Sequence, residues 1–261
     1  MKRRKLAAVF FAAVTVLGFA AAAGAVDGTI DINQAKVLAA GGFPFTISTS
    51  GSYRLTGNLT VPLNTNGIVV GANFLTIDLN GFSITGPGSG TGTGIISGLF
   101  GGITVENGAV TGFHDGVVLG ADSIVKSVHA DLNANNGITA GNNSVIAGCT
   151  ANSNGNLGIT AGDNSGVEGC TANSNTAFGI DCSFNGCTIS NNAANGNNIG
   201  IRLRGSGGVI LHNTSINNSH QGIEAADNTT GYGENVLTLD GIPNVTGGTS
   251  MKNNVCNGAL C

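Results

Sequence analysis

The sequence predicts an all-β fold, a parallel β-helix or solenoid of about eight turns with a short N-terminal capping helix. Glycine and asparagine, which are poor helix formers and favour turns, supply 44 and 33 of the 261 residues. Charged residues are only 9% and hydrophobic residues 41%, a balance that excludes a disordered chain. A repeat of 21 or 22 residues along most of the chain then predicts the solenoid.

Each turn of the repeat is marked by a glycine followed by isoleucine or valine. The steps between these aliphatic residues are 27, 22, 21, 21, 21, 21 and 22, and the residues are Ile68, Ile95, Val117, Ile138, Ile159, Ile180, Ile201 and Ile223. The Leu-x-x-Leu-x-Leu pattern of a leucine-rich repeat is missing, and the units hold short runs of β-type residues instead. We therefore expect the aliphatic residues to stack inward as a ladder, and corner asparagines to bond within their own turns.

The flanks of the repeat divide the chain into four parts. Residues 1–25 are expected to be a signal peptide, 26–44 an N-terminal cap, 45–240 the solenoid and 241–261 a C-terminal cap or tail. Within the first cap, Asp31 to Ala40 is expected to be a helix that stops at Gly41 and Gly42. A strand from Asn235 to Asp240 and a loop are expected to finish the rod.

The first 25 residues predict export from a bacterial cell. Four basic residues, Lys2 to Lys5, precede an apolar run to about Ala23, and Ala23-Gly24-Ala25 offers a small-residue cleavage site. A retained membrane anchor is the alternative, because the run approaches the length that spans a bilayer. After cleavage six basic residues face 14 acidic ones, a net charge of −8 that disfavours nucleic acid as a partner. The expected location is periplasmic, secreted or at the cell surface, without stable membrane insertion.

Three segments resemble the opening of a known group of proteins. Residues 45–62, followed by Leu75-Thr-Ile-Asp-Leu-Asn-Gly-Phe82 and by Val105-Glu-Asn-Gly-Ala-Val-Thr-Gly-Phe113, are similar to exported bacterial right-handed parallel β-helix proteins. These share the pectin-lyase-like superfold. The resemblance implies a right-handed helix over most of the mature chain. The same superfold serves lyases, hydrolases, epimerases, tailspikes and adhesins, so it leaves the activity open.

The motifs of the enzymes in this superfold are missing from the sequence. The Asn-Thr-Asp, Asp-Asp, His-Gly and Arg-Ile-Lys strings of polygalacturonase-like hydrolases and the Asp-Pro-His string of alginate epimerases do not occur. We therefore expect a non-catalytic module that binds an extracellular polysaccharide or serves at the cell surface as a structural or adhesive element. The alternative is a polysaccharide lyase, glycoside hydrolase or epimerase.

One column of stacked residues is the candidate ligand site. The residue after each aliphatic residue should point outward, which aligns Asp181, Arg202 and Glu224 in successive turns, and Arg204 and Asp227 follow nearby. Three interpretations of this column are open: an exposed ion ladder, a sugar-binding patch or a catalytic pair of carboxylates. The interposed Arg202 favours the charged form of both carboxylates, which disfavours a general acid. As an exposed ladder, the column should lose only about 0–1 kcal/mol on Arg202→Ala.

The four histidines predict no metal or acid–base site. His114 and His220 share a column but are five turns apart, about 24 Å, and His129 and His212 occupy other columns. No cofactor or metal is therefore expected, and Asp78 is interpreted as structural.

All six cysteines follow the leader, where export would permit disulfides. Cys149 and Cys170 stack one turn apart and are expected to stay reduced in the core, although a vertical disulfide is conceivable. Cys187 joins them if its turn has a shorter first corner, and the partner of Cys182 is left open. Cys256 and Cys261 are expected to form a disulfide that pins the end of the chain.

Overall fold

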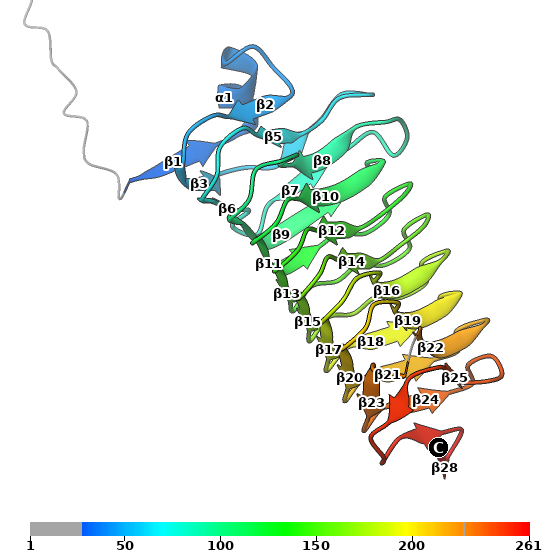
Figure 1. The fold of residues 1–261 in the computed structure, drawn as a ribbon. Coiled ribbons are helices and arrows are strands. Elements are labelled where there is room, and N and C mark those ends of the chain that lie inside the picture. The colour runs from blue at the N-terminus through cyan, green and yellow to red at the C-terminus, as the bar shows by residue number, and fades with distance from the viewer. Residues whose placement is uncertain (1–27, 227) are drawn as a thin grey trace, which may run out of the picture.

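The described part of the chain, residues 28–226 and 228–261 of a computed structural model, is an elongated stack of β-strand turns (Figure 1). The leader expected over residues 1–25 lies outside this part. No helix among the described residues is both long and apolar enough to cross a membrane.

Parallel strands stack into three sheets that run along the rod. The ten-stranded sheet holds β2 (Phe45–Ile47), β5 (Ile68–Val70), β8 (Thr93–Ile96), β10 (Asp115–Leu119), β12 (Ile138–Ala140), β14 (Ile159–Ala161), β16 (Phe178–Cys182), β19 (Ile199–Leu203), β22 (Gln221–Ala225) and β25 (Val245–Thr246). The thirteen-stranded sheet holds β1 (Thr29–Ile32), β3 (Gly51–Leu55), β4 (Leu59–Thr60), β6 (Leu75–Asp78), β7 (Ser83–Thr85), β9 (Ile103–Thr111), β11 (Ile124–His129), β13 (Val145–Ala147), β15 (Gly166–Glu168), β17 (Thr188–Ser190), β20 (Val209–Leu211), β23 (Gly231–Gly233) and β26 (Thr249–Ser250). The five-stranded sheet holds β18 (Ala193–Asn195), β21 (Thr214–Ile216), β24 (Val236–Thr238), β27 (Val255–Cys256) and β28 (Ala259–Leu260).

The solenoid has about ten turns, two more than the repeat predicted. Eight strands of the ten-stranded sheet carry the glycine–aliphatic pair. The first and last strands do not, because β2 follows Pro44 and β25 follows Asn244. Phe45 and Val245 still take the aliphatic position, since they are the register partners of Ile68 and Ile223. Strand pairing extends beyond the expected range of 45–240 at both ends, through β1 at the N-terminal end and through β25 to β28 at the other.

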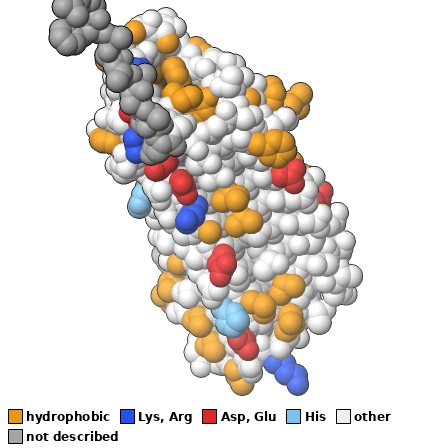
Figure 2. All heavy atoms as spheres, turned by 90° about the vertical axis from the view of Figure 1, so that its left-hand side faces the viewer, with side chains coloured by type: hydrophobic (Ala, Val, Ile, Leu, Met, Phe, Trp, Pro, Cys, Tyr) orange, Lys and Arg blue, Asp and Glu red, His pale blue; other side chains and the backbone are white. Residues whose placement is uncertain are grey.

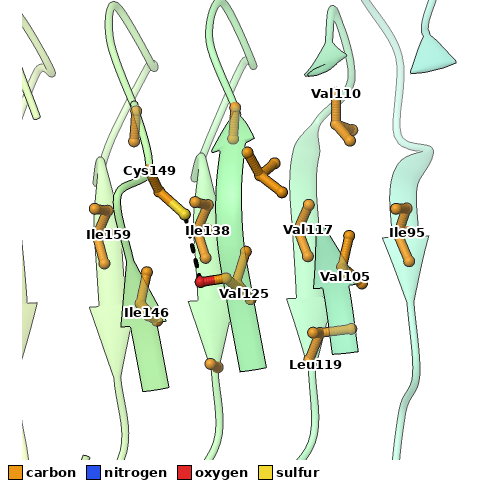
Figure 3. Packing of buried hydrophobic residues seen from close by; sticks show 14 of the residues in the cluster. Ile95, Val105, Val110, Val117, Leu119, Val125, Ile138, Ile146, Cys149 and Ile159 are labelled. Atoms are coloured by element: carbon orange, nitrogen blue, oxygen red, sulfur yellow. Dashed lines mark hydrogen bonds between the residues drawn. The ribbon is translucent and has the colours of Figure 1, made fainter. Parts of the chain in front are cut away.

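The predicted inward ladder is confirmed. Ile138, Ile159, Ile180 and Ile201 are register partners in consecutive turns, and all four are fully buried. Figure 3 shows how such residues from two facing sheets meet inside the rod, with Ile138 and Val117 on one side and Val125 and Val105 on the other. Each aliphatic residue thus packs against equivalents above and below it.

Each pair needs a glycine because the backbone of the next turn lies too close to leave room for a side chain. A Cβ atom built on Gly158 would lie 2.6 Å from the carbonyl oxygen of Gly179, and one on Gly179 would lie equally close to Gly200 O. Any larger residue would push the turns apart and break the ladder.

The N-terminal cap differs from the expected helix at its start. Thr29–Ile32 forms strand β1, which pairs in parallel with β3, so Asp31 and Ile32 are not helical. Helix α1 (Gln34–Ala39) begins after Asn33, whose side chain accepts a hydrogen bond from Lys36 N, and it buries Val37. A capping asparagine ends the strand and starts the helix at the same point.

Buried asparagines form ladders between turns, whereas the sequence suggested bonds within each turn. In one ladder, the side-chain oxygen of each member after the first accepts two hydrogen bonds from the asparagine before it, one from the backbone N–H and one from the amide nitrogen. Its members are Asn133, Asn154, Asn175, Asn197, Asn218 and Asp240. The expected left-handed corner asparagines also occur, for example Asn143 and Asn164. The asparagine excess therefore serves both corners and core.

The ladder ends on an aspartate, which predicts a stabilising substitution. Asp240 is 6% exposed, its Oδ1 accepts from Asn218 N and Nδ2, and its Oδ2 is buried without a partner. Asn218 Nδ2 also donates to the carbonyl of Ala194, whose register partner is Ser215. Asp240→Asn should therefore place an amide donor near Ser215 O, remove a buried charge and raise the free energy of unfolding by about 1 kcal/mol. Urea denaturation checks this, and a loss of stability would mean that the carboxylate is needed.

The cysteines divide into two disulfides and one thiol pair. Cys256 is bonded to Cys261, the pair expected from the sequence, and Cys182 is bonded to Cys187. Cys187 therefore does not join the cysteine column. Asn192 takes that place, because Cys149 N donates to Cys170 Sγ and Cys170 N donates to Asn192 Oδ1.

The thiol pair is expected to be inert in the folded protein. Cys149 and Cys170 are both buried, so a reagent in solution does not reach either sulfur. The hydrogen bond between the two thiol groups, together with burial, raises the pKa of Cys170, and the same bond lowers the pKa of Cys149. A thiol-reactive dye at neutral pH should find no cysteine in the oxidised native protein and two after unfolding, both from peptides that hold residues 149 and 170. A native protein that reacts, or a free Cys261, would contradict this assignment.

The C-terminal end holds more strands than expected. The predicted strand is β24, at Val236–Thr238, but β25, β26 and β27 then add to all three sheets. β28 turns back antiparallel on β27 and covers the last edge of the five-stranded sheet. The Cys256–Cys261 disulfide ties these two strands together.

Candidate functional site

The structure places Asp181, Arg202 and Glu224 in one column of the ten-stranded sheet, as the repeat predicts. Asp181 is the register partner of Arg202, and Arg202 is that of Glu224. Thr160 precedes Asp181 in the same column. The stacking order was therefore available from the sequence.

The expected exposure of this column is wrong for its two central residues. The side chains of Asp181 and Arg202 are 3% and 9% exposed. Arg202 donates to both carboxylate oxygens, from Nε to Oδ1 at 2.6 Å and from Nη2 to Oδ2 at 2.9 Å. Its guanidinium also lies 3.6 Å from the ring centroid of Phe178, and Ser183 donates to Asp181 Oδ2. The planar fork and the ring cover the carboxylate, so the pair is a packed structural element.

The remaining candidates in this region do not complete a ladder. Glu224 is half-buried and forms no ion pair with any described residue, and Arg204 is exposed just beyond the end of β19. Asp227 lies outside the described residues. Of the four described candidates among the five ligand-binding residues, Arg204 is thus exposed, Glu224 is half-buried, and Asp181 and Arg202 are buried.

The histidines lie apart, as their columns predict. Nδ1 of His114 lies 2.9 Å from Asp115 Oδ2, while His129 bonds to Thr150 and His212 to Glu234. These contacts each join a histidine to a neighbour in its own or the next turn. Within the described ranges, no three His, Cys, Asp or Glu side chains come together in a way that could hold a metal ion.

Sequence reasoning missed a row of charged side chains on the outer face of the thirteen-stranded sheet. Figure 2, which views this face, shows acidic and basic side chains spread along the rod. Strand register places six of them in one column, with Ala147 between the last two: Asp31, Arg54, Asp78, Glu106, Lys126 and Glu168. We call these six residues the charged row.

Neighbours within the charged row are partly paired. Arg54 lies 3.0 Å from Asp31, and Lys126 Nζ lies 3.9 Å from Glu106. Asp78 accepts from Asn80 N and Asn107 Nδ2, at 2.8 and 3.2 Å. The Lys126 side chain is 59% exposed and Glu168 is exposed as well, whereas the other four residues of the row are half-buried.

A local sequence signal could have found part of this row. Leu75-Thr-Ile-Asp78 and Ile103-Thr-Val-Glu106 share one pattern, in which the buried aliphatic residue precedes the acid. The spacing of 28 between the acids hid the match, because an inserted corner lengthens that turn.

Comparison with known proteins supports the fold and leaves the activity open. No family model matches the sequence, and no curated protein matches it. The crystal structure of the pectate lyase Pel9A is similar over 87% of this chain and 72% of that one, with a TM-score of 0.52 and 15% identity. The A-module of the mannuronan C-5 epimerase AlgE4 from Azotobacter vinelandii covers 78% of this chain and 76% of its own, at a TM-score of 0.43 and 14% identity. The chain thus has the pectin-lyase-like parallel β-helix fold.

Proposed function

We propose that this chain is an exported, non-catalytic module that binds an extracellular polysaccharide along the outer face of the thirteen-stranded sheet. The observation that carries the proposal is the charged row, a line of half-buried and exposed hydrogen-bonding side chains on six of seven consecutive turns. The pectate lyase of similar fold is named for action on a polysaccharide.

The spacing of the row suits a polymer. Parallel turns repeat about every 4.8 Å, the strand spacing of a sheet, so a polymer lying along the rod meets a charged side chain at every step except that of Ala147. Carboxylates accept from sugar hydroxyls, and Lys126 donates to their oxygens. Four acids against two bases leave the row negative, which favours a neutral polysaccharide over a polyuronate.

The pairing within the row favours binding over catalysis. Lys126 lies 3.9 Å from Glu106 and is exposed to a ligand. Arg54 is held by Asp31 of the neighbouring turn, and Asp78 is held by two N–H donors. Side chains fixed in this way present a rigid surface at low entropic cost on binding.

One observation favours a glycoside hydrolase as a second candidate. Asp78 and Glu106 are register partners one turn apart, about 4.8 Å along the rod, close to the carboxyl separation of retaining glycosidases. Purified protein should be incubated with neutral and uronate polymers, and new reducing ends or unsaturated products measured. Turnover that is lost in both Asp78→Asn and Glu106→Gln would replace the binding proposal.

A glycan array with variants tests the binding proposal. We expect the wild type to bind neutral polysaccharides, and the double variant Lys126→Ala/Glu168→Ala to bind at least tenfold more weakly at unchanged thermal stability. Arg204→Ala is the matched control, because it removes an exposed charge from the other large sheet. Equal binding by all three proteins, or no binding to any glycan, would overturn the proposal.

Export is tested separately by expression of the full chain in a bacterium. We expect the protein outside the cytoplasm, with Val26 as its first residue by mass spectrometry. Two disulfides in the structure are compatible with that location. An uncleaved protein that stays with the membrane would favour the anchor.

A further inference from the structure

The C-terminal end of the rod has a hollow with a volume of about 330 Å³. It is bounded by inward-facing residues of the last turns and by the disulfide that holds β28. Its lining residues are Tyr232, Pro243, Asn244, Val245, Cys256 and Cys261. This size lies at the lower end of the range found for small-molecule sites.

Tyr232 ends an inward column that also contains the chain's other tyrosine. The column runs from Tyr53 through aliphatic residues, from Ile77 to Ile210, to Tyr232. Tyr53 is buried and its hydroxyl bonds to Thr49, whereas the Tyr232 ring is only partly buried and its hydroxyl bonds to no described residue. An amphipathic ring with an unbonded hydroxyl suits a site that is apolar at one end and wet at the other.

Asn244 brings a second unpaired group to the same hollow. Its Nδ2 is buried without a hydrogen-bond partner, while its Oδ1 accepts from Asn257 Nδ2 at 3.4 Å. A buried amide N–H without an acceptor costs free energy, which a rotation of the Asn244 side chain toward an oxygen in the hollow would recover. The six lining residues include no Asp, Glu, Lys or Arg, so the hollow suits an uncharged ligand.

We propose that this hollow binds a single neutral sugar residue, such as one end of a polysaccharide chain. The Tyr232 ring would pack on the C–H face of the sugar, and its hydroxyl would bond to a sugar hydroxyl. Asn244 would turn its amide toward the hollow, where Nδ2 would donate to a sugar oxygen. The choice of sugar as ligand rests on the proposed polysaccharide function, but the site is separate from the charged row.

The Cys256–Cys261 disulfide should control this site. Both cysteines line the hollow, and the bond keeps β28 on β27 beside it. Cys256→Ser/Cys261→Ser should therefore weaken sugar binding. Cys182→Ser/Cys187→Ser removes the other disulfide, several turns away, and should leave binding unchanged.

Tyrosine NMR provides a test with an internal control, because the chain has only two tyrosines. The full oxidised chain, labelled at the tyrosine rings, is titrated with glucose, mannose, galactose and N-acetylglucosamine. We expect one of these sugars to shift the Tyr232 signal saturably, with a Kd of about 1 mM. The Tyr53 signal should stay in place, because that hydroxyl is bonded to Thr49 near the other end of the rod.

Variants complete the test and separate it from the polysaccharide proposal. Asn244→Ala should abolish the Tyr232 shift at unchanged thermal stability, while Lys126→Ala/Glu168→Ala should keep it. No shift up to saturating sugar, or equal shifts of both tyrosines, would overturn the site even if the array shows polymer binding. A Tyr232 shift without polymer binding would instead retain this site and reject the charged row.

Discussion

Asn175→Ala should lower the free energy of unfolding by about 3–6 kcal/mol, far more than the loss of an exposed corner asparagine. The Asn175 side chain sits in the middle of the buried ladder and makes four hydrogen bonds. Oδ1 accepts from Asn154 N and Nδ2, and Nδ2 donates to Ala151 O and Asn197 Oδ1. Alanine leaves these buried partners unsatisfied, and two or three of them carry the cost because neighbours relax.

Asn143→Gly is the matched control for this prediction. Asn143 is an exposed corner residue at φ +56°, and its side chain makes one bond, to Asp122. Glycine keeps the left-handed backbone, so the change should cost about 0.5 kcal/mol or less. Urea denaturation of both variants measures the difference. Similar losses in the two proteins would show that the ladder adds little to stability.

The periodic part of this fold could be predicted from the sequence because neighbouring turns contact each other directly. The step of 21 residues fixes register, and register fixes which residues stack, as with Ile159 on Ile138 and Arg202 on Asp181. The pairing of Cys256 with Cys261 also followed from position, since no column was left for either.

Burial on the outer face could not be predicted in the same way. Register places Asp181 and Arg202 side by side but does not reveal that Phe178 and Ser183 cover them. Phe178 is the first residue of β16, before the glycine–aliphatic pair, and Ser183 directly follows the end of that strand, so both lie outside the repeated core positions. The charged row was hidden for a similar reason, because corner lengths shift its spacing from turn to turn.

The asparagine ladder was hidden by a chemical ambiguity. Asparagine is common both at left-handed corners and in buried amide stacks, and composition alone does not separate the two uses. The position of an asparagine within the repeat separates the two uses. Asn154 and Asn175 lie 21 residues apart at the same buried position, while Asn143 and Asn164 lie 21 residues apart at an exposed one. The same phase explains why Asn192 continues the column of Cys149 and Cys170.

Arg202→Ala should lower the free energy of unfolding by about 3–5 kcal/mol, well above the cost expected for an exposed ladder. The change removes both charge-assisted bonds to Asp181 and leaves a buried carboxylate with Ser183 as its main donor. The contact of the guanidinium with the Phe178 ring is lost as well. Salt should alter the loss little, because a buried pair is poorly screened.

Two further variants decide what the pair contributes. Arg204→Ala, on an exposed neighbour of like charge, should cost about 0.5 kcal/mol or less. The double variant Asp181→Leu/Arg202→Met should recover most of the loss, because removing both charges leaves none buried and unpaired.

Glycan binding should be measured on the same proteins. A small, salt-sensitive loss in Arg202→Ala would instead support an exposed ion ladder, and lost binding at unchanged stability would make Arg202 a ligand contact. If the double variant stays as unstable as Arg202→Ala, packing around Phe178 outweighs the charge pair.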